Sequence, residues 1–471
     1  MKKIVTLMLA AAMLCGAGTA QAVDFSAKGE WVMSFEAGRG GSFDEDAYGY
    51  GGEEDNFTAR QRIRLQLDAV ASEALSGTVY FQIGDQVWGK SEDGAALGAD
   101  GRQVKVKQAY LDWLVPGTAL TLRMGLQGVS MPSFAGQQFS FDEDHTTAGI
   151  VASYKFNDNV ALTGMWLRLY NDNFADERPD GEHGRDAGYL DNVDMLALVL
   201  PLTFDGVNVT PWAAYGLVGR NYAMRGWDDE DLHPGNLGFL MGNVREQDRS
   251  GLKDYSDLLL AGLTGEVTLA DPFRIAWDFQ YSRLSTGKER YDQQGWFATL
   301  LAEYKLDWAT PGLYAWYASG EDDDSSNGSE RMVTFGAQGG NEYARFAFDG
   351  QEYISRGAVL GDTMSGTWGV GVRLADMSFL ENVKHSLRVN YIGGTNEKDG
   401  LKNMEETGLN SLTREERALE AGLTTEWKLY ENLTLHSDIA YLALWNQNYG
   451  FRDGISKTDA WNANVSFAYS F

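Results

Sequence analysis

The last twelve residues of the chain alternate between two kinds of side chain, in the pattern of an extended strand. One set is apolar and mostly aromatic and the other is small and mostly polar: Trp461, Ala463, Val465, Phe467, Tyr469 and Phe471 against Asn462, Asn464, Ser466, Ala468 and Ser470. Successive side chains of a strand point to opposite faces, so this pattern indicates lipid on one face and water on the other. A strand of a soluble sandwich is the alternative, but the same alternation recurs along the chain.

The alternation from Phe25 to Ala37 is longer than an average strand of about five or six residues. A tilted strand needs about nine to eleven residues to cross a bilayer, so this length also favours a membrane. The predicted outward faces carry no charge, as expected because an Arg or Lys at the bilayer midplane costs roughly 2 to 4 kcal/mol. They include Phe57, Ile63, Leu65 and Leu67; Leu75, Val79, Phe81 and Ile83; Phe273, Ile275, Trp277, Phe279 and Tyr281; and Trp368, Val370, Val372 and Leu374. A change of phase near Gln108 and Ala109 predicts a bulge.

Short turns alternate with long loops along the chain. The predicted turns are Ala71–Ala74, Val115–Thr118, Asn157–Asn159, Thr203–Gly206, Ala270–Pro272, Asp307–Pro311, Met377–Asn382 and Tyr430–Asn432. The predicted loops are Gly38–Asp55, Gly89–Arg102, Gln127–Thr146, Asp172–Asp191, Val218–Tyr255, Ser285–Gln294, Glu321–Met364, Glu397–Arg417 and Gln447–Thr458. We therefore predict an all-β fold, a transmembrane antiparallel β-barrel of about 18 strands with 16 as the alternative, with short periplasmic turns and long extracellular loops.

The N-terminus has the form of a secretory signal. Lys2 and Lys3 precede an apolar run, and Ala20-Gln21-Ala22 forms a small-x-small cleavage site. We predict a cleaved signal peptide over residues 1–22 and a single barrel domain over 23–471. The one cysteine, Cys15, lies in the signal, which excludes disulfides and cysteine-zinc sites from the mature chain. No apolar run of 18 residues follows, and mean hydropathy is −0.33, so helical membrane spans are excluded.

The water-facing side of the strands carries a set of basic residues. Arg60, Arg62 and Arg64 alternate along one strand, and the set continues on neighbouring strands with Lys105, Lys107 and Arg123. The segment Gln127–Thr146 resembles the third loop of general porins, which folds into the barrel and narrows it. Its acidic residues, Asp142, Glu143 and Asp144, would face the basic wall and form a charged, pore-lining constriction. The alternative is a solvated face whose arginines pair with neighbouring carboxylates.

The net charge of −28 is concentrated in loops, including Asp44–Asp46, Asp228–Asp231 and Glu321–Asp324. Such runs are typical of solvated surface, although clustered carboxylates could also bind Ca²⁺ that bridges to lipopolysaccharide. No other cofactor or metal is predicted, and an acidic chain is a poor ligand for nucleic acid. An enzyme is also disfavoured: His436 and Asp438 share the lumen face, whereas Ser437 lies on the opposite face.

Three segments carry a resemblance to a known family: VDFSAKGEW near the start, LRMGLQGVSMPSFAGQQFSFDED in the middle and NVSFAYSF at the end. With them the chain resembles the homotrimeric outer-membrane porins of sulfate-reducing bacteria, and its terminal Phe471 resembles the insertion signal of bacterial outer-membrane barrels. The resemblance implies passive diffusion of small hydrophilic solutes and ions through a Gram-negative outer membrane. It also implies a homotrimer in contact with lipid and lipopolysaccharide, inserted by the barrel-assembly machinery. A substrate-specific channel for sugars or oxyanions is the alternative, and a barrel hydrolase is a third.

Overall fold

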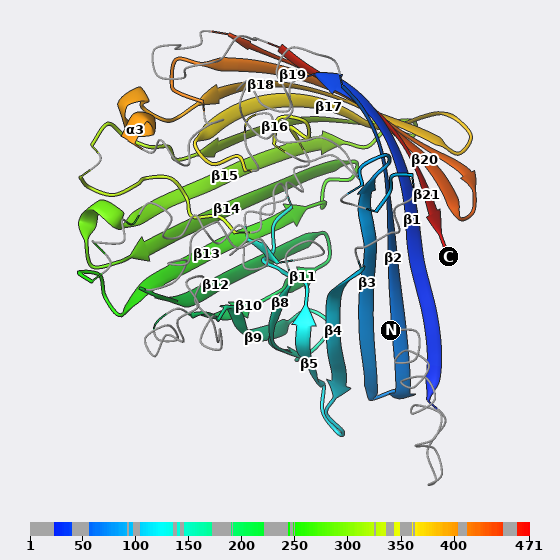
Figure 1. Ribbon diagram of the computed structural model, residues 1–471, viewed down its shortest axis with the longest axis horizontal. Coiled ribbons are helices and arrows are strands. Elements are labelled where there is room, and N and C mark those ends of the chain that lie inside the picture. The colour runs from blue at the N-terminus through cyan, green and yellow to red at the C-terminus, as the bar shows by residue number, and fades with distance from the viewer. Residues whose placement is uncertain are drawn as a thin grey trace.

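In the computed structural model, the chain runs back and forth as long strands between the two ends of a curved sheet (Figure 1). No helix in the part of the chain described is long and apolar enough to cross a membrane. The structure describes residues 23–39, 56–91, 94–97, 104–134, 139–141, 146–171, 190, 192–220, 244, 248, 250–324, 326–335, 343–348, 360, 363–403, 412–445 and 459–471. The predicted signal segment 1–22 lies outside these residues.

The main sheet contains nineteen strands as assigned. They are β1 (Asp24–Arg39), β2 (Asn56–Ser72), β3 (Leu75–Val87), β4 (Val104–Leu114), β5 (Leu120–Gln127), β8 (Thr147–Lys155), β9 (Ala161–Tyr170), β10 (Val193–Val199), β11 (Leu202–Phe204), β12 (Val207–Gly219), β13 (Tyr255–Val267), β14 (Phe273–Ser285), β15 (Gln293–Tyr304), β16 (Thr310–Ala318), β17 (Thr367–Leu380), β18 (Val383–Gly394), β19 (Arg417–Tyr430), β20 (Leu433–Trp445) and β21 (Asp459–Ser470). A two-stranded sheet joins β6 (Val129–Ser130) to β7 (Ser140–Phe141). A 3-10 turn, η3 (Glu289–Tyr291), and a short helix, α3 (Lys398–Asn403), lie in loops.

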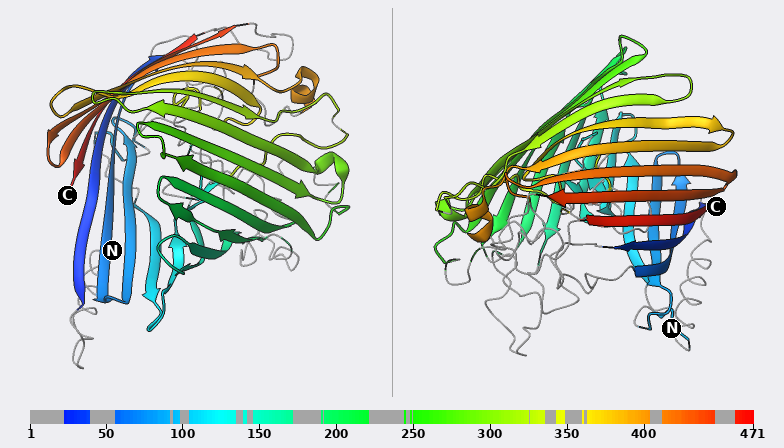
Figure 2. Two further views of the ribbon diagram at one scale, coloured as in Figure 1. Left: turned by 180° about the vertical axis from the view of Figure 1, so that it is seen from behind. Right: turned by 90° about the horizontal axis from the view of Figure 1, so that it is seen from above.

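The sheet closes into a barrel of 18 strands. Strands β10 and β11 pair with β12 in one continuous register and are separated only at Leu200 and Pro201, so the nineteen assigned strands count as eighteen. Proline has no N–H to donate to the ladder, which accounts for the interruption. The first strand pairs antiparallel with both β2 and β21, so the first and last strands lie side by side (Figure 2). The predicted barrel and its strand number are confirmed, in preference to 16.

The predicted alternation of faces is also confirmed. Phe57, Phe273 and Val372 expose 68%, 54% and 52% of their surface on the outside, while Arg64 and Asp278 on the inside are buried. Every predicted turn overlaps a short connection at one end of the barrel, and the predicted long loops begin and end at the other end. An outward apolar belt of this kind requires a bilayer, and the closed antiparallel barrel is the architecture of outer-membrane proteins.

A β-bulge interrupts β4 close to the predicted position. Tyr80 of β3 pairs with Gln108 and Phe81 pairs with Val106, which leaves Lys107 as the extra residue. The bulge lets Val104 and Val106 face outward on one side of it while Leu111 and Trp113 face outward on the other. It therefore keeps apolar residues on the lipid side across a change of sequence phase.

One part of the inner wall is apolar, contrary to the expectation of a wet interior throughout. On β10 both faces are apolar, with Leu196 and Leu198 outward and Met195 and Ala197 inward and buried. The inward apolar surface continues onto β9, β12 and β13 through Leu167, Trp212, Leu258 and Leu260. A buried apolar surface inside a barrel must be covered by protein, and two loops cover it.

Candidate functional site

Loop 3 connects β5 to β8 over residues 128–146, and its described residues 129–134 and 139–141 fold into the lumen as predicted. Its residues 129–131 pair with 139–141, and Met131 and Phe139 are buried against the apolar inner wall. The Trp212 indole donates a hydrogen bond of 3.0 Å to the Pro132 carbonyl. One carboxylate oxygen of Asp278 accepts bonds of 2.9 Å from both the Ser133 hydroxyl and the Phe134 backbone N–H. A wall carboxylate thus holds the loop across the barrel.

Loop 7 connects β16 to β17 over residues 319–366, and its residues 333–335 and 343–348 also enter the lumen, a feature that alternation did not predict. The Tyr343 ring stacks on Tyr314 of the wall at 4.0 Å, and its hydroxyl lies 3.2 Å from the Thr299 hydroxyl. The buried carboxylate of Glu420 accepts the backbone N–H groups of Phe346 and Ala347 at 3.3 and 3.4 Å. The apolar stretch from Phe346 to Phe348, inside a long loop of an acidic chain, is the signal that could have indicated burial.

The two loops pack against each other inside the barrel. Phe139 of loop 3 and Phe335 of loop 7 form a parallel backbone bridge, and their rings lie 5.8 Å apart. Phe134 of loop 3 meets Tyr343 of loop 7 edge to face at 6.2 Å. These contacts bury four aromatic rings between wall and loops, so loops 3 and 7 form one packed unit against β12 to β16.

The base of loop 7 is fixed at the extracellular rim. The side chain of Asn396, in the loop between β18 and β19, accepts the Glu321 N–H at 3.0 Å and donates to the Gly366 and Leu412 carbonyls. The Glu321 carboxyl is buried and accepts the Ser329 hydroxyl at 2.5 Å. Burial raises the pKa of the Glu321 carboxyl to about 7.

The predicted basic residues on β2 and β4 face the lumen on the side away from this packed unit. We use the name basic sector for Arg60, Arg62, Arg64, Lys105 and Lys107. Lys105 is exposed, Arg60 and Arg62 are half-buried, and Arg64 and Lys107 are buried. The Arg64 Nε donates to Gln82 at 3.1 Å. Their predicted partners, Asp142, Glu143 and Asp144, lie outside the described residues, so the charged constriction stays a prediction.

Arg123, the sixth predicted basic residue, is held differently. Its Nε and Nη2 atoms donate to the two oxygens of Asp112 at 2.8 Å each, and its guanidinium lies 4.0 Å from the centre of the Tyr110 ring. This bidentate pair on adjacent strands satisfies the arginine within the wall. The structure therefore separates Arg123 from the basic sector.

A row of ionic side chains crosses the inner wall below loop 3. Arg274 donates to Glu266 and to Glu303, each at 2.8 Å, and Arg373 donates to Glu303 at 2.6 and 2.8 Å. Arg388 lies directly opposite Arg373 in the sheet register and donates to Thr424, which in turn donates to Asp438 at 2.7 Å. We call Glu266, Arg274, Glu303, Arg373, Arg388 and Asp438 the charge belt. His436 closes its end, with Nε2 3.2 Å from Asp438.

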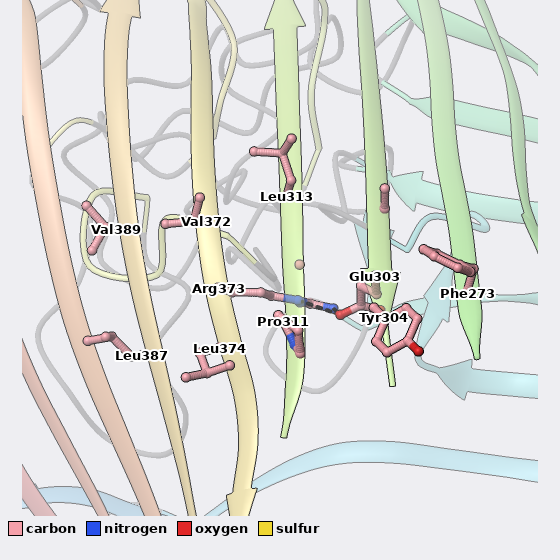
Figure 3. Close-up of a pocket in the computed structure, with 12 residues that line it drawn as sticks. Phe273, Glu303, Tyr304, Pro311, Leu313, Val372, Arg373, Leu374, Leu387 and Val389 are labelled. Carbon is pink, nitrogen blue, oxygen red and sulfur yellow. Dashed lines mark hydrogen bonds and ion pairs between the residues drawn. The ribbon is translucent and has the colours of Figure 1, made fainter. Parts of the chain in front are cut away.

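Gly312 of β16 makes the link between Glu303 and Arg373 possible. The two ionic residues belong to β15 and β17, and β16 runs between them. A Cβ at Gly312 would lie 3.1 Å from Glu303 Cγ and 3.2 Å from Arg373 Cγ, so a larger residue would push the pair apart. Figure 3 shows the ion pair crossing this point, behind an apolar groove of 490 Å³ that includes Pro311, Leu313 and Leu374. The groove contains exposed outward side chains and therefore faces lipid.

Of the three acidic loop segments predicted as possible Ca²⁺ sites, the structure describes only Glu321–Asp324. Asp44–Asp46 and Asp228–Asp231 lie outside the described residues. Within the described ranges no three His, Cys, Asp or Glu side chains are grouped so as to hold a metal ion.

The chain resembles several solved outer-membrane proteins in fold. OprD from Pseudomonas aeruginosa matches with a TM-score of 0.54 and 12% identity over 97% of this chain and 96% of that chain. OccAB3 from Acinetobacter baumannii matches with 0.54 and 10% over 95% and 100%. OpdK from Pseudomonas aeruginosa, solved with vanillate, matches with 0.51 and 10% over 95% and 98%. No protein-family model and no curated protein sequence matches. The chain therefore has the fold of these outer-membrane porins, an 18-stranded barrel that spans the Gram-negative outer membrane.

Proposed function

We propose that this protein is an outer-membrane channel that selects small hydrophilic solutes by charge and favours anions. The observation that carries the proposal is the asymmetry of the lumen. Loops 3 and 7 pack together against β12 to β16, whereas the basic sector lies on β2 and β4, on a different part of the inner wall. Positive charge along a narrow aqueous path raises the local concentration of anions. The structural similarity to OpdK with vanillate, an aromatic carboxylate, supports a carboxylate as one such solute.

The test compares solutes of similar size and different charge. Proteoliposomes containing the full-length protein would take up gluconate faster than glucose at low salt, and the difference would shrink in 1 M KCl because the Debye length falls to about 3 Å. Uptake ordered only by size would overturn charge selection. Failure of any solute or ion to pass would overturn the channel itself.

A general-diffusion porin is the second candidate, and the charge belt favours it. The belt contains three carboxylates and three guanidiniums, so its formal charge is 3 − 3 = 0. A neutral polar wall of this kind attracts neither sign of ion over the other. Equal permeability of gluconate and glucose would support this candidate.

The proposal also includes a cleaved signal over residues 1–22 and a homotrimer in contact with lipopolysaccharide. Both are supported by the sequence features and by the resemblance to homotrimeric porins of sulfate-reducing bacteria. N-terminal sequencing and chemical cross-linking of the outer-membrane form would check them. No catalytic role is proposed, since Ser437 faces away from His436 and Asp438.

A further inference from the structure

We infer that Glu303 sets the ion preference of the periplasmic exit of the channel, because it is the carboxylate that balances two guanidiniums at once. The inference rests on the proposed channel function, but it does not depend on whether that channel selects anions or passes solutes generally. It concerns a wall separate from the basic sector.

The end of the charge belt that contains Glu303 lies at the exit. Glu266 and Glu303 are the next-to-last residues of β13 and β15, and Arg274 is the second residue of β14, so all three lie near the periplasmic turns. Asp278, which holds loop 3, lies two inward positions further from that end. The Phe134 ring of loop 3 lies 6.0 Å from the Arg274 guanidinium. A solute that passes loop 3 therefore meets the belt next.

The belt is in contact with water at one end and buried at the other. The side chains of Arg274 and Glu266 are 35% and 32% exposed, whereas those of Arg373 and Glu303 are 9% and 6% exposed. Within the belt Glu303 uses one oxygen for Arg274 and the other for Arg373. Arg373 also lies opposite Arg388, and like charges directly opposite in a sheet repel. Loss of the Glu303 charge would leave the belt with three guanidiniums, those of Arg274, Arg373 and Arg388, and only two carboxylates.

The predicted effect follows from Coulomb's law. If the separation between the lost charge and a passing ion is taken as about 7 Å, the loss changes the ratio of anion to cation concentration by roughly threefold at 0.1 M salt. Glu303→Gln keeps the shape of the side chain and gives the belt a charge of +1, so anion permeability should rise. Arg373→Gln gives −1 and should shift permeability toward cations. The double variant restores the charge to zero and should return to the wild-type ratio.

The experiment measures reversal potentials of the full-length protein in planar bilayers under a KCl gradient centred on 0.1 M. Asp257→Asn is the matched control, because Asp257 pairs with Lys253 on the outward face of β13 and its charge lies outside the lumen. Opposite shifts in the two single variants and recovery in the double variant would support the inference. Shifts of the same sign, no shift, or no recovery would each overturn it.

Two further measurements keep the outcome interpretable. Heat-dependent gel mobility would report whether each variant forms the barrel. If Glu303→Gln does not fold, Glu266→Gln at the exposed end of the belt should shift the ratio in the same direction by a smaller amount, and a lack of that shift would count against the inference. Absence of wild-type conductance would instead refute the proposed channel.

Discussion

Asp278 should control how firmly loop 3 stays in the lumen. Its Oδ2 atom accepts two hydrogen bonds of 2.9 Å, from the Ser133 hydroxyl and the Phe134 N–H. Hydrogen bonds to charged groups contribute about 1.5 to 3 kcal/mol each, so Asp278→Ala should destabilise the docked loop by roughly 3 to 6 kcal/mol. That corresponds to a change of roughly 10² to 10⁴ in the equilibrium between docked and undocked loop.

Single-channel recording would detect this change as more frequent transitions to a higher conductance. Asp112→Ala is the matched control, because Asp112 is also a lumen carboxylate but both of its oxygens accept hydrogen bonds from Arg123 of the neighbouring strand. If Asp278→Ala and Asp112→Ala gave the same conductance and the same frequency of transitions, Asp278 would not be the anchor of the loop.

Three further predictions concern other parts of the molecule. Replacement of the three arginines of the basic sector by glutamine should shift permeability toward cations at low salt, and an unchanged reversal potential would contradict their placement on the solute path. A Cβ at Gly29 would come within 2.5 Å of the Arg64 carbonyl oxygen and 2.7 Å of the Phe471 ring, so Gly29→Val should lower the yield of heat-modifiable barrel. Deletion of Phe471 should lower it as well, because the ring that packs over Gly29 is lost. The Glu321 carboxyl has a pKa of about 7 in the folded protein and 4.5 when free. Its contribution to the stability of the folded protein, about 3 kcal/mol, is therefore complete below pH 4.5 and is lost as the pH rises through 7. Protease cleavage of loop 7 should therefore be faster at pH 8 than at pH 5, and Glu321→Gln should remove that difference.

The barrel could be predicted from the sequence because each face of a membrane strand meets a single medium. The alternation of apolar and polar residues therefore indicates which face of each strand meets lipid. The number of strands followed from the turns and loops between the alternating segments. Even the bulge at Lys107 left a visible change of phase. The apolar run of β10 was the exception, since its outer face meets lipid and its inner face is covered by protein, so the sequence does not alternate there.

The interior could be predicted only in part. The pairing of Glu303 with Arg373 spans 70 residues and depends on the glycine between them, so no local pattern indicates it. Loop 7 was missed because alternation says nothing about irregular segments. The acidic partners of the basic sector, Asp142, Glu143 and Asp144, lie outside the described residues, and their opposition to the arginines remains a prediction.

The contact between loops 3 and 7 has a consequence for biogenesis. Phe139 and Phe335 pair directly although 335 − 139 = 196 positions separate them. If the strands insert in chain order, loop 3 lacks its packing partner, loop 7, until β16 and the chain after it have reached the membrane. We expect the nascent barrel to be wider inside than the mature one, and permeability to be restricted only at the last stage of maturation. Accessibility of Tyr343 to aqueous reagents, followed in time, should fall after heat-resistant barrel has formed rather than before.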